Sequence, residues 1–223
     1  MEEIVVHTRR GDVRLVRGLG AGQLEGLKMS EGLGIFFHYR YEDAERTKRL
    51  LIDLCSNELV TVSAAISGDT LAGYVTIVPA EESGRWGALN EALKELYPDI
   101  DRPILFELGS IEIGKRWRGM GLGTRLLEHT FGGAFDGAIV FLRELSWHWD
   151  TRETGLSIYK YRNMLFKMFE CVGFEYFYTD EKEVAYSGEN MFMARIGKDV
   201  PGEISFRFCK SLRNKRPGGW GWS

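Results

Sequence analysis

Cysteine and proline are scarce in this sequence, and long apolar runs are absent. The 223 residues include 3 cysteines and 5 prolines. Cys55, Cys171 and Cys209 are odd in number and widely spaced, which excludes a disulfide framework and gives no metal-ligand spacing. No apolar run reaches the length of a membrane span, and the first residues lack the apolar core of a signal peptide. We therefore expect a cytoplasmic protein with no membrane partner and no metal.

An excess of charge of one sign is also missing. Lysine and arginine number 29 against 32 acidic residues, with a net charge of −3 and a pI near 5.9, which argues against a nucleic-acid partner. The chain is long enough for one well-buried domain, expected over residues 1–200. Residues 201–223 are basic and aromatic. They form either a solvated tail or an arm that docks on a protein partner.

Hydrophobic periodicity and turn residues predict alternating helices and strands. Mixed order with a central strand–turn–helix unit indicates an α/β or α+β domain of three layers. The pattern predicts strands at 4–16 (two strands around Gly11-Asp12), 59–78 (a hairpin around Ser67-Gly68-Asp69), 103–113, 138–147, 174–178 and 191–196, and helices at 43–54, 86–97, from Leu122 to about Gly132, and 156–172.

A glycine-rich turn joins the strand at 103–113 to the helix that follows it. Its sequence is Arg118-Gly119-Met120-Gly121-Leu122-Gly123. Glycine lacks the Cβ atom that would keep a phosphate away from the backbone, and the N–H groups at a helix N-terminus favour anions. Arg118 adds a positive charge where phosphates would arrive. The turn therefore predicts a phosphate-containing ligand.

The spacing of the glycines excludes two common phosphate-binding motifs. Thr124 stands where the dinucleotide fingerprint needs its third glycine, and no Gly-Lys-Ser/Thr follows as in a P-loop. The remaining pattern, Arg-x-x-Gly-x-Gly after a strand, resembles the acetyl-CoA pyrophosphate loop of the GNAT acetyltransferase superfamily. The resemblance implies a mixed sheet that splays at the acetyl-CoA strand, with helices on both faces. It also implies acetyl-CoA contacts at Ile111, Ile113, Arg118, Gly119, Met120, Gly121, Leu122, Gly123 and Thr124.

Other segments resemble one family within that superfamily, the acetoin-utilisation acetyltransferases of bacilli. The resemblance covers most of residues 70–201 and rests on Glu107-Leu108-Gly109, Ile111-Glu112, Ser146-Trp147-His148-Trp149-Asp150, Gly155-Leu156-Ser157, Tyr161-Arg162, Glu175-Tyr176-Phe177 and Met193-Ala194-Arg195-Ile196-Gly197-Lys198. It implies an enzyme that acetylates a lysine of AMP-forming acetyl-CoA synthetase and so inactivates it. Composition and spacing do not themselves indicate that substrate.

Acetyl transfer to a lysine requires a base, because an amine with a pKa of about 10.4 is almost fully protonated at neutral pH. Two glutamates on the strand at 103–113 are candidates. Glu107 matches the position of the base in histone-acetylating members, and its apolar neighbours are expected to raise its pKa. Glu112 has the opposite strand parity unless a bulge near Gly109-Ser110 re-aims it. We favour Glu107, while either carboxylate could instead be an ion-pair partner.

The usual acid of the superfamily is missing. Phe169 stands where many members carry a tyrosine that protonates the leaving thiolate. Tyr159, Tyr161 or His148 could replace it, or the thiolate leaves unaided. Tyr161 could equally be a core residue. Trp147, His148, Trp149 and Asp150 cannot all face inward from a strand, so we expect this cluster to form a wall of the acceptor-lysine site, with Tyr161 as a further substrate-binding candidate.

Two other functions are compatible with the sequence. An enzyme acting on a small amine would have a closed acceptor pocket around Trp147 and Trp149. A CoA-binding regulator would inhibit its partner by holding it, and the phenylalanine at position 169 fits that function. Glu107 beside an intact glycine loop favours catalysis.

Overall fold

The computed structural model describes residues 2–34, 44–100 and 102–213. Its elements follow the predicted order closely. They are β1 (Glu2–Thr8), β2 (Gly11–Arg17), α1 (Ala21–Glu25), β3 (Lys28–Met29), α2 (Ala44–Cys55), β4 (Thr61–Ser67), β5 (Thr70–Pro79), α3 (Arg85–Leu96), β6 (Leu105–Ile113), the 3-10 turn η2 (Lys115–Trp117), α4 (Leu122–Phe131), β7 (Ile139–Glu144), the 3-10 turn η3 (Ser146–His148), α5 (Thr151–Thr154), α6 (Ile158–Glu170), β8 (Glu175–Tyr176), α7 (Lys182–Ala185), β9 (Met191–Ile196) and α8 (Gly202–Ser211).

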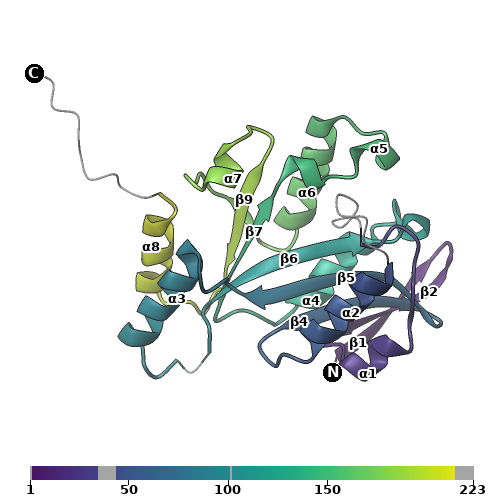
Figure 1. The fold of residues 1–223 in the computed structure, drawn as a ribbon, viewed down its shortest axis with the longest axis horizontal. Coiled ribbons are helices and arrows are strands. Elements are labelled where there is room, and N and C mark those ends of the chain that lie inside the picture. Colours follow the sequence, from purple (N-terminus) through teal and green to yellow (C-terminus); the bar gives the residue numbers. More distant parts are fainter. Residues whose placement is uncertain (1, 35–43, 101, 214–223) are drawn as a thin grey trace, which may run out of the picture.

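One mixed sheet runs through the molecule in the order β1-β2-β4-β5-β6-β7-β9-β8, with the short β3 parallel to β5 (Figure 1). The hairpins β1–β2 and β4–β5 are antiparallel, as the alternation of β-branched residues predicts. The β6–β7 pair is parallel, with the glycine turn and α4 as its crossover. The predicted α/β class with a mixed sheet is confirmed.

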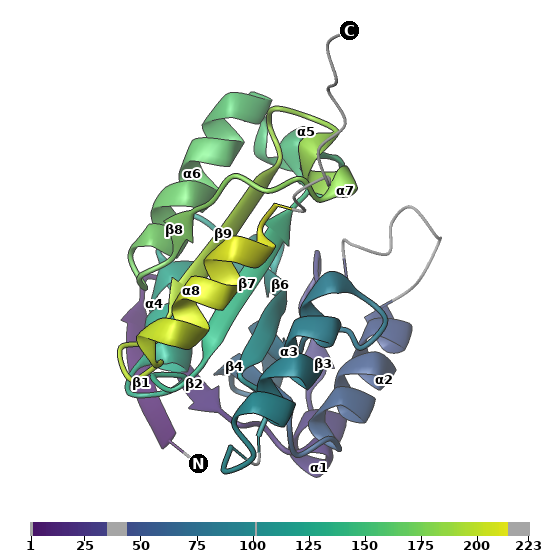
Figure 2. The same cartoon turned by 90° about the vertical axis from the view of Figure 1, so that its left-hand side faces the viewer.

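Helices cover both faces of the sheet. On one face α4 and α6 bury Leu126, Leu127, Leu165 and Phe169 against β5, β6 and β7. On the other face two separate apolar clusters form, one with α1 and α2 and one with α3 and α8. Figure 2 shows α6 and α2 on opposite sides of the sheet. None of the helices in the described part of the chain is long and apolar enough to cross a membrane.

The two neighbours of β6 pair with it over different lengths. β5 pairs along almost all of β6, with a shift in register that leaves Gly109 unpaired, so the bulge considered near Gly109-Ser110 is present. β7 pairs with β6 only at its start, over Leu105–Glu107 and Ile139–Phe141. Beyond these pairs the strands separate, and the later part of β6 presents an open backbone edge toward β7.

The structure differs from the sequence-based expectations at three places in the second half of the chain. The strand expected at 138–147 ends at Glu144, because the backbone turns into η3 at Ser146. The short α5 and α7 were not predicted. The segment after residue 200 begins with α8, whose Ile204 and Phe208 are fully buried, so this part is not a solvated tail. Asp43, at the start of the predicted helix 43–54, and Lys215, Arg216, Trp220 and Trp222 lie outside the described residues.

Candidate active site

The glycine turn lies between η2 and α4, as the sequence predicts. Gly119 and Gly121 have φ values of 71° and 70°, a left-handed conformation that favours glycine. Gly121 is the N-cap of α4 and makes no side-chain capping bond, so backbone N–H groups are directed outward from the helix start. Gly123 has a different role, because a Cβ there would lie 3.2 Å from Met168 Sδ on α6. The turn is suited to an anion at the N-terminus of α4.

Arg118 is directed toward the protein rather than toward the open side of the turn. Its Nε donates to the Ile113 carbonyl at 2.9 Å, its Nη1 to Asp150 Oδ2 at 2.6 Å and its Nη2 to the Gly32 carbonyl at 3.3 Å. Asp150, whose side chain is 8% exposed, balances the charge. These contacts fix the turn to the end of β6, and the expectation that the Arg118 charge serves the phosphates stays a prediction.

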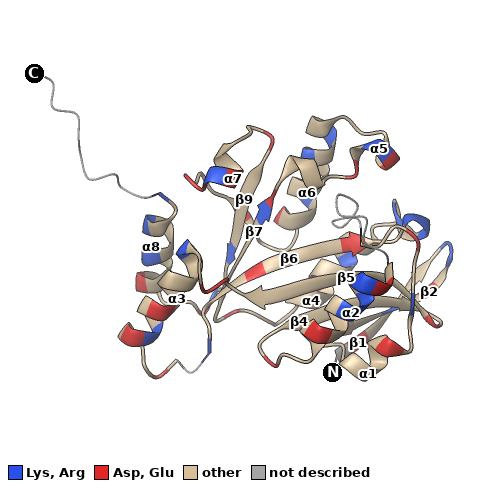
Figure 3. Cartoon of the chain, viewed as in Figure 1, with Lys and Arg blue, Asp and Glu red and all other residues tan. Residues whose placement is uncertain are grey.

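The bulge at Gly109 decides which side chains of β6 share a face. Phe106 and Leu108 before it, and Ile111 and Ile113 after it, all pack toward α4 and α6. Without the bulge, strict alternation would place these two pairs on opposite faces. Glu107 and Glu112 consequently both lie on the other face, toward α2 and α3, so the predicted difference in their parity is removed. Figure 3 shows these acidic positions on β6.

Glu107 forms a two-pronged ion pair with Arg143 of β7. Arg143 Nε and Nη2 lie 2.9 and 2.8 Å from Glu107 Oε1, and Nη2 lies 2.9 Å from Oε2. Burial raises the pKa of the Glu107 carboxyl, and the guanidinium opposes that rise. Arg143 also lies 3.8 Å from Glu181. Glu107 stands at the last residue of β6 that pairs with β7, directly beside the separation of the strands.

Glu112 is more deeply buried and is held by the protein on its own face. Its Oε2 accepts a short hydrogen bond from the Gly34 N–H. It lies opposite Tyr74 of β5, and burial together with the Glu112 carboxylate raises the pKa of the Tyr74 hydroxyl. These contacts suit a residue that holds the loop at Gly34 against the sheet.

A cavity of about 550 Å³ lies on this face between α2 and the strands β5 and β6. Polar groups from the sheet, including Thr76 and Ser110, form its floor, and apolar residues of α2 form its wall. The lining residues are Thr47, Leu50, Leu51, Asp53, Leu54, Asn57, Tyr74, Thr76, Val78, Gly109 and Ser110. Its volume is in the range of small-ligand pockets.

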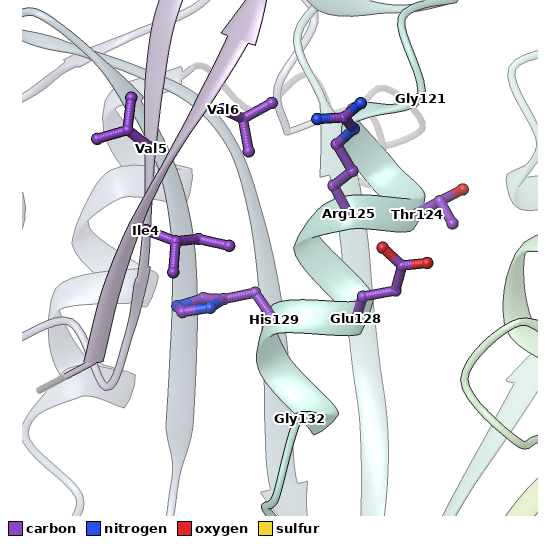
Figure 4. A pocket seen from close by; sticks show the side chains of 9 residues that line it. All are labelled: Ile4, Val5, Val6, Gly121, Thr124, Arg125, Glu128, His129 and Gly132. Carbon is purple, nitrogen blue, oxygen red and sulfur yellow. The ribbon is translucent and has the colours of Figure 1, made fainter.

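A second cavity, of about 850 Å³, lies between β1 and α4 (Figure 4). Gly121, Thr124 and Arg125 line it from the first turn of α4, and Glu128 and His129 from the second. The side chains of β1 that face it are apolar. In Figure 4 the side chains of Arg125 and His129 are directed toward β1, whereas that of Thr124 lies on the side of α4 away from β1.

The tryptophan cluster after β7 is divided between surface and core. Trp147 is 39% exposed and its ring lies 6.2 Å from that of Tyr186, edge to face. His148 is half-buried, and burial lowers the pKa of its imidazole. Trp149 is buried among core residues of the α6 face. The expectation that part of this cluster faces outward therefore applies to Trp147 and His148, not to Trp149.

Trp149 connects the end of β7 to α6. Its indole Nε1 donates to Glu144 Oε2 at 2.8 Å, and its ring stacks on Tyr161 at 5.6 Å with an interplanar angle of 19°. Burial raises the pKa of Tyr161. Phe169 lies further along α6 than Tyr161 and is completely buried.

Sequence reasoning did not identify Arg143 or Glu144 as site residues. The available signal was an adjacent pair of charged residues directly after the apolar run Ile139–Leu142, at the end of a central strand. Their partners, Glu107 and Trp149, are brought to them by the sheet register and by η3, neither of which is visible in the sequence.

Comparison with known proteins identifies the family of the chain. Residues 28–148 match the model of the acetyltransferase (GNAT) family, and the chain belongs to that family. It is an acetyl-CoA-dependent acetyltransferase, as the resemblance of its glycine loop implied.

More specific similarity is to the acetoin utilization protein AcuA. The chain is 28% identical to AcuA of Bacillus licheniformis over 91% of this chain and 90% of the relative. It is 32% identical to AcuA of Bacillus subtilis, over 71% and 70%. The crystal structure of an acetoin utilization protein from Exiguobacterium sibiricum superposes with a TM-score of 0.83 and 27% identity, covering 96% of this chain and 95% of that one. The predicted GNAT fold and the resemblance to the acetoin-utilisation family are confirmed.

Proposed function

We propose that this enzyme acetylates a lysine of a protein, AMP-forming acetyl-CoA synthetase, and thereby inactivates it. The observation that carries the proposal is the similarity to AcuA along nearly the whole chain. The synthetase is the substrate implied by the sequence resemblance to that family.

The residues of the glycine turn fit acetyl-CoA. The left-handed glycines Gly119 and Gly121 and the start of α4 would hold the pyrophosphate through backbone N–H groups. Arg118 keeps the turn against β6. The open edge of β6, at Ile111 and Ile113, would pair with the amide groups of the cofactor arm. When bound, acetyl-CoA supplies an activated acetyl thioester.

Glu107 is the better candidate for the base that takes the proton of the lysine amine. It stands beside the separation of β6 and β7, whereas Glu112 is engaged by Gly34 and Tyr74. Arg143 fixes the Glu107 carboxylate. The two carboxylate oxygens of Glu107 together offer about four lone-pair positions, so the carboxylate can still accept a proton from the amine. The further acidic groups near Arg143, Glu181 and Glu183, favour the approach of a cationic side chain.

The test is to incubate the enzyme with acetyl-CoA and purified AMP-forming acetyl-CoA synthetase, and to map acetyl-lysine by mass spectrometry. We expect one stoichiometrically modified lysine and loss of synthetase activity. Glu107→Gln should slow the modification by about 100-fold or more, the usual share of a general base. Inhibition without modification would indicate a binding regulator and contradict the proposal.

A second candidate function is acetylation of a small amine. The cavity of about 550 Å³ beside β6 favours it, because its size suits a small ligand and its floor carries hydroxyl groups. An unmodified, fully active synthetase together with CoA release in the presence of small primary amines would support this alternative.

A further inference from the structure

Glu144 is placed on the opposite face of the sheet from Glu107. Along β7, Val140 and Leu142 pack toward α4 and α6, whereas Ile139 and Phe141 pack toward α3 and α8. Alternation therefore directs Glu144 to the α6 face and Arg143 to the Glu107 face. Glu144 also lies beyond Phe141, the last residue of β7 that pairs with β6. It thus borders the separation of the strands on the side that carries the glycine turn.

Glu144 accepts a hydrogen bond from a neighbouring side chain. Among the described residues, no lysine, arginine or histidine forms an ion pair with it. Trp149 Nε1 donates to its Oε2 at 2.8 Å. The titratable neighbour from α6 is Tyr161, which interacts in turn with the Arg118–Asp150 pair. The cross-strand neighbour on β9, Met191, is apolar. Burial accordingly raises the pKa of Glu144 to about 7.

The two glutamates differ in their partners. Burial raises the pKa of the Glu107 carboxyl, but a guanidinium holds this group and opposes the rise. Glu144 is partly buried, and the indole N–H is the hydrogen-bond donor that contacts it, so nothing comparable opposes the rise in its pKa. Two carboxyl groups whose surroundings differ in this way can act as base and acid in one site. Phe169, at the position where the resemblance to the superfamily implies a tyrosine acid, has no proton to give.

We propose that Glu144, held by Trp149, is the proton donor for the leaving thiol in this enzyme. The inference requires acetyl transfer from CoA, but it does not depend on which amine is the acceptor.

The proposed step is balanced in protons and electrons. The ammonium group first gives one proton to solvent, and the neutral amine nitrogen then forms a bond to the acetyl carbon and loses a second proton to the base. The carbon–sulfur bond breaks, its electron pair goes to sulfur, and sulfur takes the proton of the Glu144 carboxyl. Transfer in this direction is favourable, because an alkyl thiol such as that of cysteine has a pKa of about 8.5. Glu144 regains a proton from solvent, and the base releases one, before the next turnover.

The first test measures release of CoA by chromatography in wild type, Glu144→Gln and Glu170→Gln. Glutamine keeps an oxygen for the Trp149 N–H but carries no acidic proton. We expect Glu144→Gln to lower kcat by about 100-fold or more while CoA affinity, measured by calorimetry, stays within about twofold. Glu170, exposed on α6, is the matched control and should leave kcat unchanged. A Glu144→Gln rate within about threefold of wild type would overturn the proposal.

The second test has a readout independent of turnover. The Trp149 indole reports on its bonded carboxyl, so wild-type fluorescence should titrate with a midpoint near 7. We expect this transition to be absent from both Glu144→Gln and Trp149→Phe, and retained in Trp147→Phe. No transition in wild type, or one that persists in Glu144→Gln, would contradict the assignment.

These tests separate this inference from the proposed function. If the synthetase is not modified, the fluorescence titration still tests the assignment of Glu144, because it requires no acceptor. A synthetase that is acetylated normally by Glu144→Gln would reject the proton donor and leave the proposed function intact.

Discussion

At the scale of single residues, the site is determined by which partner each charged side chain meets. Glu107 meets Arg143, Glu144 meets Trp149, and Arg118 meets Asp150. The sequence was sufficient to select Glu107, Glu112 and Arg118 as functional candidates by type and spacing. It could not show the partners Arg143, Gly34 and Asp150, because each of them lies 32 or more residues away in the chain from the residue that it contacts.

Glu144 is expected to make stability depend on pH. The pKa of Glu144 in the folded protein, about 7, lies above the ordinary value of 4.5. The contribution of its protonated form to the free energy of unfolding is therefore fully present below pH 4.5 and is lost as pH rises through 7. Relative to Glu144→Gln, wild type should lose about 2–3 kcal/mol of unfolding free energy between pH 5 and pH 8. Urea unfolding of both proteins at the two pH values measures this. A constant difference between them would contradict the raised pKa.

Asp150 is expected to fix the glycine turn through Arg118. Asp150→Asn weakens a largely buried charge-assisted bond of 2.6 Å, which we expect to cost about 1.5–3 kcal/mol of unfolding free energy and to weaken CoA binding. Asp136→Asn, which disturbs the Arg195 pair elsewhere in the fold, is the control. Denaturant unfolding and calorimetric CoA titration measure the two effects. Equal loss of CoA affinity in both variants would show that Arg118 has no specific role at the turn.

At the scale of elements, the periodic segments were predictable and the irregular ones were not. The helices α2, α3, α4 and α6 and the hairpins carry clear apolar periodicity, and their bounds agree with the prediction to within a few residues. The end of β7 was placed wrongly, because Ser146–His148 is compatible with a strand by propensity but closes into a 3-10 turn. The bulge at Gly109 could be considered from the sequence. Only the register with β5 shows that it brings Glu107 and Glu112 to one face.

The left-handed conformation of Gly121 is expected to be essential to the start of α4. No atom lies within 4 Å of a Cβ built there, so the penalty of a substitution comes from φ rather than from crowding. Gly121→Val should lower the unfolding free energy by about 1–2 kcal/mol and abolish measurable CoA binding. Gly188→Ala, at an open position without a left-handed φ, should do neither. The two variants are compared by urea unfolding and calorimetry. Normal CoA binding by Gly121→Val would contradict the proposed role of the glycine turn in holding CoA.

At the scale of the whole molecule, α8 completes the domain rather than following it. Phe208 packs with Trp86 of α3 at a ring distance of 5.0 Å, beneath β7 and β9. The composition after residue 200 predicted a boundary, because basic residues are frequent there. The helix is amphipathic, however, and its buried positions Ile204 and Phe208 and its C-cap Leu212 are spaced four residues apart.

Phe208 and Phe206 provide a matched pair to test this. Phe208→Ala should cost about 3–5 kcal/mol of unfolding free energy, because it empties a fully buried ring position. Phe206→Ala, on the same helix with 61% of the residue exposed, should cost little. Denaturant unfolding measures both. Similar small effects would indicate that α8 is not part of the core.

The central claim is that acetyl-CoA lies between the separated strands β6 and β7, with its phosphates at the glycine turn. A crystal structure of the full chain with CoA bound tests it most directly. We expect the pyrophosphate against the N–H groups from Gly119 to Gly123, the cofactor arm along Ile111 and Ile113, and the sulfur on the Glu144 side of the sheet. CoA seated instead in the groove between β1 and α4 would contradict the account.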